Sequence, residues 1–243
     1  MAKLRVDILL TRKGLAESRE KAKILVMAGV VYLNGERISG ADKAVDEDAP
    51  IEVRSNPLVY VGFGGVKLEE AVRCFGIDIA GKTVIDIGSS TGGFVDYLLK
   101  AGASRVHAVD VGTHQLHERL RGDPRVVVRE NVNARYLSVE DIGERADIVT
   151  VDVSFISLKK IIPAILPLLA PPGLLITLVK PQFEVGRYQV GKGGIVKDGE
   201  RIRAVMDDIR QFGEGIGLRV RSVCDAPRER ERKNREYFIL WER

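Results

Sequence analysis

The segment from residue 83 to residue 94 has the composition of a loop that could hold a nucleoside ligand. It opens with an apolar, β-branched run that ends at Ile87 and suits a buried parallel strand. Small residues follow, so backbone N–H groups can approach a ligand before a helix begins near Gly93. Asp110 ends the next apolar run, where a ribose-binding acid would stand. A glycine turn alone could be purely structural, and it is the later acid that favours a ligand site.

The charge of this loop indicates which nucleoside it would hold. The dinucleotide fingerprint has a second glycine beside a pyrophosphate, whereas here Ser90 occupies that position and Asp86 precedes the turn. An acid at the strand end repels a pyrophosphate and suits a cation. S-adenosylmethionine carries a sulfonium and an ammonium group and no phosphate. The sequence therefore favours methyl transfer over hydride transfer.

The composition is that of a globular protein with a buried core, since 45% of the 243 residues are hydrophobic. The formal net charge of +4 is compatible with a polyanionic partner, and residues 1–23 carry an excess of four positive charges at the N-terminal end. The cysteines, Cys74 and Cys224, have neither disulfide nor metal-ligand spacing. We therefore expect no metal site and a reducing cytoplasm.

No apolar signal core follows the N-terminus, so the sequence does not predict export. The uncharged run over residues 161–179 is long enough to be considered as a membrane span. Prolines and Gly173 divide it into a helix, a turn and a strand over residues 174–179. We expect a buried part of an α/β fold there and no membrane span.

Apolar runs separated by helical stretches predict one sheet, with strands at residues 84–87, 105–110, 126–129, 148–152, 174–179, 218–223 and 237–241. This alternation predicts an α/β fold with a doubly wound, Rossmann-like domain, whose ligands gather at the carboxyl ends of the strands. The chain places five polar residues at or near those ends: Asp86, Asp110, Asn133, Asp152 and Lys180.

The beginning of the chain is organised differently. A short helix comes first, and Ser18 can cap a second helix that Gly29 can end. A hairpin with a type I′ turn at Asn34-Gly35 follows. Arg19 and Lys23 lie four apart on one helical face, where like charges cost stability unless an anion meets them. A solvated face explains that pair equally well when it is taken alone.

Residues 3–54 also contain four short segments in an informative order: Arg5-Val6-Asp7, Leu15-Ala16-Glu17-Ser18-Arg19, Gly29-Val30-Val31 and Asn34-Gly35. Together they resemble the S4-type RNA-binding domain, a small α+β module that binds structured RNA. The resemblance implies an S4-like domain over residues 1–55 and RNA contacts by Arg5, Arg19 and Lys23. A linker over residues 56–61, with Pro57 near its start, would lead to a methyltransferase domain over residues 62–243.

The rest of the chain carries a second resemblance. Its segments include Gly64 to Leu68, Ser89 to Phe94, Asp152 to Leu158, Lys180 to Gly186 and Asn234 to Phe238. They resemble the TlyA family of ribosomal RNA 2′-O-methyltransferases, which is related to the FtsJ-type ribose methyltransferases. Members use S-adenosylmethionine, and the matching motifs carry a Lys–Asp–Lys–Glu tetrad onto Lys67, Asp152, Lys180 and Glu236.

The same resemblance implies how the cofactor would be held. Gly88, Ser89, Gly92 and Gly93 would line its methionine part, Asp110 would accept from the ribose hydroxyls, and Asn133 would contact the adenine. The complete set of expected cofactor contacts is Asp86, Gly88, Ser89, Ser90, Gly92, Gly93, Phe94, Asp110 and Asn133.

The tetrad makes chemical sense because a ribose 2′-hydroxyl is a poor nucleophile at neutral pH. The site must remove or polarise its proton while the oxygen attacks a methyl group in line. We expect Lys180 to act as the base, with Lys67 favouring the neutral amine or stabilising the alkoxide. Asp152 and Glu236 would orient the lysines, but their charges oppose loss of the proton. Lys180 therefore has two possible roles, as a free base or as an electrostatic stabiliser.

Two departures from the family pattern stand out. The family usually has an arginine where this chain has Phe63, so any contact made by that arginine is in doubt. The charged segment 228–233 stands where a glycine-containing loop is more typical. It could be a basic loop facing RNA, although a solvated loop is the slightly preferred interpretation.

The resemblance implies ribosomal RNA or a ribosomal subunit as partner, with a cytidine ribose of large-subunit RNA as the expected target. Longer family members also act on the small subunit, and this sequence ends at Arg243, directly after its last predicted strand, as the shorter form does. We expect a cytoplasmic enzyme, without a metal, and a monomer in preference to an oligomer.

Three other interpretations of these residues remain. A methyltransferase acting on a base or on transfer RNA could use the same loop, but neither cysteine stands at a strand end where a nucleophile would meet the cofactor. An RNA-binding ribosome assembly factor could have the cofactor pocket without catalysing a reaction. A protein without catalytic activity would have little physical need for the two lysines and two acids of the tetrad. Relatives named hemolysin suggest a membrane-active protein, which the proline-divided apolar run argues against.

Overall fold

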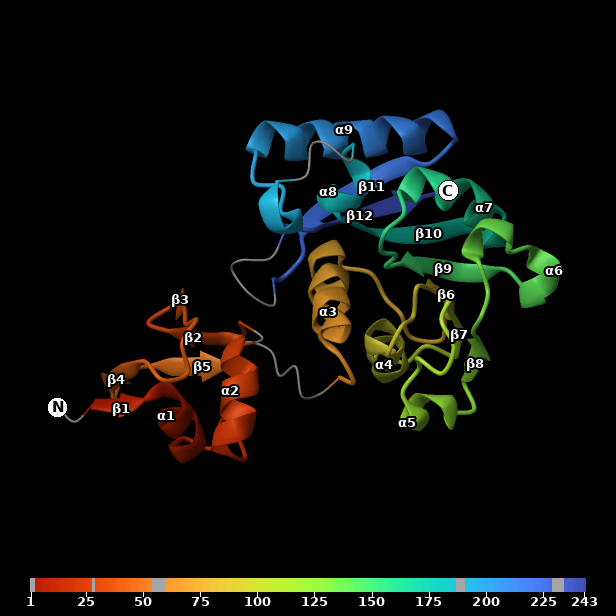
Figure 1. The fold of residues 1–243 in the computed structure, drawn as a ribbon. Helices are drawn as coiled ribbons and strands as arrows, with labels where there is room; N and C mark the ends of the chain where they lie inside the picture. Colours follow the sequence, from red (N-terminus) through yellow and green to blue (C-terminus); the bar gives the residue numbers. More distant parts are fainter. Residues whose placement is uncertain (1–2, 28, 54–59, 187–190, 229–233) are drawn as a thin grey trace.

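The computed structural model describes residues 3–27, 29–53, 60–186, 191–228 and 234–243 (Figure 1). A small α+β unit forms the N-terminal part, and an α/β unit built on one large sheet forms the remainder. Part of the expected linker 56–61 and most of the charged segment 228–233 lie outside the described residues. The expectations for those two segments therefore remain predictions.

The N-terminal unit packs two helices against two small antiparallel sheets, one formed by β1 and β4 and one in the order β3-β2-β5. Apolar side chains from both helices and from β2, among them Leu9, Leu25 and Val31, form its buried core. Its elements are β1 (Lys3–Arg5), α1 (Val6–Arg12), α2 (Arg19–Met27), β2 (Val31–Leu33), β3 (Glu36–Arg37), β4 (Ala44–Asp46) and β5 (Ile51–Val53).

Local sequence explains the predicted parts of this unit. The hydroxyl oxygen of Ser18 accepts from the backbone N–H of Lys21 at 3.2 Å, as the N-cap of α2 should. Asn34 and Gly35 have φ angles of 51° and 80°, the positive values that a type I′ turn requires. The two helices and the hairpin are therefore confirmed, whereas β1, β4 and β5 were not foreseen.

The large sheet has seven strands in the order β11-β12-β10-β9-β6-β7-β8. The pairs from β10 through β9, β6 and β7 to β8 are parallel, and β12 runs antiparallel between β10 and β11. Its strands are β6 (Thr83–Ile87), β7 (Arg105–Val109), β8 (Val126–Arg129), β9 (Ala146–Val151), β10 (Leu169–Val179), β11 (Arg219–Asp225) and β12 (Tyr237–Glu242).

Helices cover both faces of this sheet, so its central strands are apolar on both sides (Figure 1). One face packs against α7 and α9, and the other against α3 and α4. The helices of the unit are α3 (Phe63–Phe75), α4 (Gly93–Lys100), α5 (Glu118–Arg121), α6 (Val139–Ile142), α7 (Ile162–Ile165), α8 (Pro181–Glu184) and α9 (Gly199–Gly215).

All seven predicted strands are confirmed, and one prediction near them is wrong. The segment around Pro171 to Gly173 was expected to be a turn, but β10 begins at Leu169 and runs through it. The strand pairs with β9 at Leu169, and the register then shifts before pairing resumes at Leu174. An irregularity in the ladder accommodates prolines within a strand, and periodicity alone could not show this.

Helix α3 joins the two units, because its opposite sides contribute to different cores. Phe63 and Val66 pack with the apolar cluster of the N-terminal unit, whereas Leu68, Ala71 and Val72 belong to a core cluster of the large sheet. Phe63 is therefore a packing residue at the start of α3 in this chain.

The two cysteines lie closer together than their sequence separation suggests. Cys74 near the end of α3 and Cys224 on β11 are free thiols, and Cys74 is close enough to affect the pKa of Cys224. Burial, with a smaller contribution from Cys74, raises the pKa of Cys224 to about 12. A thiol with so high a pKa is a poor nucleophile at neutral pH.

Candidate functional site

The loop after β6 brings the backbone close to the neighbouring strand end. Gly88 has a φ of +86°, and its N–H donates to the carbonyl of Val109 at 2.8 Å. A Cβ atom built on Gly88 would lie 2.3 Å from the carbonyl oxygen of Asp152. Only glycine meets both requirements at this position, since other residues rarely adopt this φ and any side chain would collide with β9.

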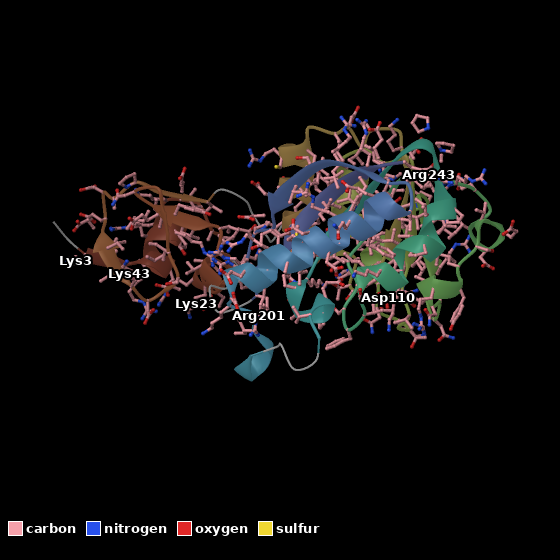
Figure 2. All side chains as sticks on the ribbon, turned by 90° about the horizontal axis from the view of Figure 1, so that it is seen from above. Lys3, Lys23, Lys43, Asp110, Arg201 and Arg243 are labelled. Carbon is pink, nitrogen blue, oxygen red and sulfur yellow. The ribbon has the colours of Figure 1, made fainter. Side chains whose placement is uncertain are left out.

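A cavity of about 570 Å³ opens at the carboxyl ends of β6, β7 and β9, which we call the strand-end cavity. Asp110 lines it, and its carboxylate accepts from the backbone N–H groups of Ser90 at 2.8 Å and Gly112 at 2.7 Å. The lining residues include five of those predicted from the sequence, namely Gly88, Ser90, Asp110, Asn133 and Asp152. Figure 2 shows Asp110 on the α/β unit and Lys23 on the N-terminal unit.

The other predicted cofactor residues stand behind this cavity and do not line it. Ser89 is buried, and its carbonyl accepts from the N–H of Gly92 at 2.8 Å. Gly92 lies against Leu116 and Leu120, and Gly93 packs closely on Gly64 and Gly65. Phe94 is a core residue beside Phe238, with ring centroids 6.1 Å apart. In the structure these residues support the loop through backbone hydrogen bonds and packing, on the side away from the cavity.

Asp86 also lies beneath the loop, fully buried on β6. One carboxylate oxygen accepts from the hydroxyl of Thr150 at 2.6 Å, and the other has no hydrogen-bond partner among the described residues. Burial raises the pKa of Asp86 to about 7, with smaller contributions from the charges of Asp152 and Asp110, while the bond from Thr150 opposes the rise.

This raised pKa predicts how stability depends on pH. The folded state holds a proton on Asp86 between about pH 4 and 7, where the unfolded state has released it, so Asp86 makes the protein less stable as the pH rises. The limit is about 1.4 kcal/mol per pH unit. We expect Asp86→Asn to flatten this dependence. The difference in unfolding free energy between the variant and the native chain should therefore shift in favour of the variant when the pH is raised from 5 to 8. Urea unfolding at both values tests this, and parallel stability profiles for the two proteins would contradict it.

Two lysine–carboxylate pairs lie next to each other, and Asp152 of one pair lines the strand-end cavity. Lys180 follows β10, and its ammonium group lies 2.5 Å from the carboxylate of Asp152 and 3.0 Å from the hydroxyl of Ser154. Lys67 on α3 lies 2.5 Å from the carboxylate of Glu236, just before β12. Both pairs are largely buried, with side-chain exposures between 11% and 22%.

The two pairs meet at a second cavity of about 310 Å³, which we call the lysine cavity. It is lined by Ser154, Lys180, Gln182, Phe183, Gly193, Ile195, Asn234 and Glu236. Ser154 also lines the strand-end cavity, so the two cavities adjoin. The structure thus brings three members of the predicted tetrad to the cavity walls, and Lys67 reaches them through Glu236.

Residues that the sequence did not single out hold these elements in place. Glu184 on α8 accepts from the hydroxyl of Ser157 at 2.5 Å and from the N–H of Leu158 at 2.9 Å. It thereby ties the segment after Asp152 to the helix after Lys180. Burial raises the pKa of Glu184, and the hydrogen bonds from Leu158 and Ser157 oppose the rise.

An aromatic pair stands at the junction of the cavities. Phe155 is 90% exposed, although its ring packs on that of Phe183 with centroids 4.9 Å apart. Its φ is +63°, which is unusual for a bulky residue and costs free energy of about 1–3 kcal/mol. Both residues lie in motifs that the sequence identified, but an exposed aromatic side chain cannot be recognised from periodicity.

The structure unites two of the three predicted RNA contacts. The guanidinium groups of Arg5 and Arg19 both bond to the carboxylate of Asp7, which is fully buried. Lys23 lies one helical turn beyond Arg19 on α2 and is not part of this cluster.

Two negative findings concern the described part of the chain. No group of three or more histidine, cysteine, aspartate or glutamate side chains there could hold a metal ion. None of its helices combines the length and the apolar character that crossing a membrane would need.

Comparisons with known proteins agree with this architecture. A family model of FtsJ-like methyltransferases matches residues 60–243, and a model of the S4 domain matches residues 4–50. The chain is 44% identical over 239 residues to the 16S/23S rRNA (cytidine-2′-O)-methyltransferase TlyA of Mycobacterium tuberculosis, covering 98% of this chain and 88% of that protein. It is 44% identical over 196 residues to Hemolysin A of Brachyspira hyodysenteriae, covering 80% of this chain and 81% of that protein.

A solved structure shows the same likeness over the whole chain. A hemolysin-named protein from Streptococcus thermophilus superposes with a TM-score of 0.74 at 40% identity, covering 100% of this chain and 89% of that one. The predicted division at residues 1–55, 56–61 and 62–243 stays a proposal, since the two family models leave residues 51–59 unassigned.

Proposed function

The chain belongs to the FtsJ-like methyltransferase family, with an S4 domain ahead of that module as in its TlyA relatives, and we propose that it methylates the 2′-oxygen of cytidine in ribosomal RNA. S-adenosylmethionine is the methyl donor. The observation that carries the proposal is the placement of two lysine–carboxylate pairs around the lysine cavity, which adjoins the strand-end cavity at Ser154. A relative named for the same reaction supports the choice of cytidine.

The strand-end cavity fits this donor in size and chemistry. Its volume of about 570 Å³ lies within the range of small-molecule sites. Backbone N–H groups fix the Asp110 carboxylate in place, so it can accept from both ribose hydroxyls of an adenosine. Asp152 adds negative charge at the wall that faces the lysine cavity. When bound, S-adenosylmethionine supplies an electrophilic methyl group on a positively charged sulfur.

The residues around the lysine cavity would act on the ribose. The 2′-hydroxyl loses its proton as its oxygen attacks, and the negative charge that develops needs a nearby cation. Lys180 supplies that cation at the junction of the two cavities, and Asp152 holds it there. Glu236 holds Lys67 in the same way from the other side.

The geometry favours one of the two roles considered for Lys180. Lys180 forms an ion pair with Asp152 at 2.5 Å, so its ammonium group stands at the cavity as a positive charge and a hydrogen-bond donor. We therefore propose that Lys180 donates a hydrogen bond to the 2′-oxygen and stabilises its developing charge. The proton would pass to a neighbouring carboxylate or to water, and the donor would be left as an uncharged thioether.

The substrate would be large-subunit ribosomal RNA, and the reaction would take place in the cytoplasm. Relatives are named for large-subunit RNA alone and for both subunits, so the subunit must be determined for this chain. The test is transfer of labelled methyl groups to unmodified large subunits, small subunits, their free RNAs and transfer RNA. We expect label in large-subunit RNA. Label confined to transfer RNA, or bound cofactor without any transfer, would contradict the proposal.

Phe155 is expected to contact the target nucleotide, because its exposed ring lines the strand-end cavity, packs on Phe183 of the lysine cavity and offers a surface on which a base can stack. Stacking on an aromatic ring is worth about 1–3 kcal/mol per base. Phe155→Ala should therefore raise the KM for RNA roughly tenfold or more, while cofactor affinity stays close to native. Phe155→Tyr, which keeps the ring, is the control. An unchanged KM in the alanine variant would show that the ring does not contact RNA.

A further inference from the structure

The buried carboxylate of Asp7 lies in the N-terminal unit and takes no part in methyl transfer. We propose that Asp7 is a positioning residue, which holds Arg5 and Arg19 side by side as a clamp for one phosphate of the RNA backbone. The inference rests on the proposed function only in taking RNA as the ligand. It concerns how the N-terminal unit binds the RNA backbone. Methylation of the ribose is a separate step.

The contacts around Asp7 are close and well directed. Arg5 donates from Nε to Oδ1 at 3.0 Å and from Nη2 to Oδ2 at 3.2 Å, a bidentate arrangement. Arg19 donates from Nη2 to the same Oδ2 at 3.1 Å. The N–H of Ile8 donates to Oδ1 at 3.0 Å, which fixes the carboxylate against the first turn of α1. The two guanidinium groups are therefore held on one carboxylate.

The exposure of these side chains shows which way the cluster faces. The side chain of Asp7 has 0% exposure, whereas those of Arg5 and Arg19 are 44% and 51% exposed. The carboxylate is thus on the protein side and the arginines are on the solvent side. Each guanidinium has five N–H donors, and most of them remain available because only three bonds are made to Asp7.

A phosphate is the ligand that this arrangement suits. The planar fork of a guanidinium group matches the oxygens of a phosphate, and two forks with one buried carboxylate leave a net positive charge. Arg5 lies at the end of β1 and Arg19 at the start of α2, so without Asp7 nothing in this cluster would hold their heads together. A clamp already held in place loses less side-chain freedom when it binds.

For a variant that lacks the Asp7 carboxylate, the clamp predicts weaker RNA binding, whereas net charge alone predicts tighter binding. Removing Asp7 makes the protein more positive, so long-range attraction alone predicts tighter RNA binding. If Asp7 positions the arginines, its removal must instead weaken binding. We expect Asp7→Asn to weaken RNA binding roughly tenfold and to raise the KM for RNA with kcat unchanged. Asp48→Ala, which removes an exposed acid of the same unit, should leave binding unchanged or tighten it slightly.

The experiment measures the affinity of the full-length chain for unmodified large-subunit ribosomal RNA over a series of salt concentrations. Asp7→Asn is the primary variant because it keeps the shape of the side chain and an acceptor for Ile8. Circular dichroism melting confirms that it folds. Arg19→Ala in the native and the Asp7→Asn background completes a double-mutant cycle.

The expected result is non-additive. Arg19→Ala should weaken binding and lower the salt dependence by about one phosphate contact in the native background, and should have much less effect when Asp7 is already replaced. A folded Asp7→Asn protein that binds RNA as well as the Asp48→Ala control would overturn the proposal. So would an Arg19→Ala effect that is the same in both backgrounds.

These binding measurements need no methyl donor, so they separate the clamp from the proposed reaction. A protein that shows the expected cycle but transfers no methyl group would keep the clamp and lose the proposed function. A protein that methylates RNA but shows no coupling between Asp7 and Arg19 would keep the function and lose the clamp.

Discussion

Lys180→Ala is expected to reduce the rate of methyl transfer by about 10²- to 10³-fold, the range typical for loss of one hydrogen-bond donor that stabilises a developing negative charge. The reason is its position, 2.5 Å from Asp152 at the junction of the cofactor-sized cavity and the lysine cavity. In the proposed mechanism, removing it leaves the developing charge on the 2′-oxygen without the cation that stabilises it. Single-turnover transfer with saturating RNA and S-adenosylmethionine measures the effect directly.

Two further variants identify the role of this lysine. Lys180→Arg keeps a positive charge but cannot serve as a base at neutral pH, so partial activity would support electrostatic stabilisation. Lys159→Ala removes a lysine that pairs with Asp208 on α9 and lines neither cavity, and it should retain native activity. Cofactor affinity is measured separately. Native turnover in a Lys180→Ala protein would remove Lys180 from the mechanism.

Gly88→Ala is expected to weaken cofactor binding roughly 100-fold and to abolish turnover at ordinary cofactor concentrations. A non-glycine residue at this φ of +86° costs about 1–3 kcal/mol of folding stability, whereas the loss of affinity comes from displacement of the cavity wall, and a roughly 100-fold loss corresponds to about 2.7 kcal/mol. The added methyl group would also lie 2.3 Å from the carbonyl oxygen of Asp152. The collision must move either the loop or the end of β9, and both line the cavity.

The chain offers a close control for this substitution. Gly143 has a φ of +89°, and a Cβ atom built there would meet nothing within 4 Å. Gly143→Ala therefore introduces the same backbone strain without a collision, far from the loop that follows β6. It should lose stability but keep native cofactor affinity. Isothermal titration of both variants checks the prediction, and equal cofactor affinities in the two would contradict it.

The architecture of the large sheet could be predicted because its central strands are apolar on both faces and most of its strands are separated by helical stretches. The short strands β1, β4 and β5 could not, since three residues carry too little alternation to be recognised. The course of β10 through Pro171 and Pro172 was misjudged for a physical reason. Proline signals a turn locally, whereas an irregularity in strand pairing can accommodate it within a sheet.

The candidate site was predictable where a residue stands at a strand end, as Asp110, Asp152 and Lys180 do. Asp86 shows the limit of that rule. It lies near the end of β6, directly before the loop, but its side chain is buried beneath the loop. The pairing of Lys67 with Glu236 depends on a contact between α3 and the start of β12, which no local pattern can reveal. The same applies to Glu184 and to the thiols of Cys74 and Cys224.

Analysis of the nucleosides from methylated RNA is the most direct test of the proposed function. Unmodified ribosomal RNA is incubated with the protein and S-adenosylmethionine, digested to nucleosides and examined by mass spectrometry, with the Lys180→Ala protein as control. We predict 2′-O-methylcytidine as the product, and we expect the Lys180→Ala protein to form much less of it than the native protein does. A methyl group on a cytosine base, or on a ribose other than that of cytidine, would contradict the account of the site.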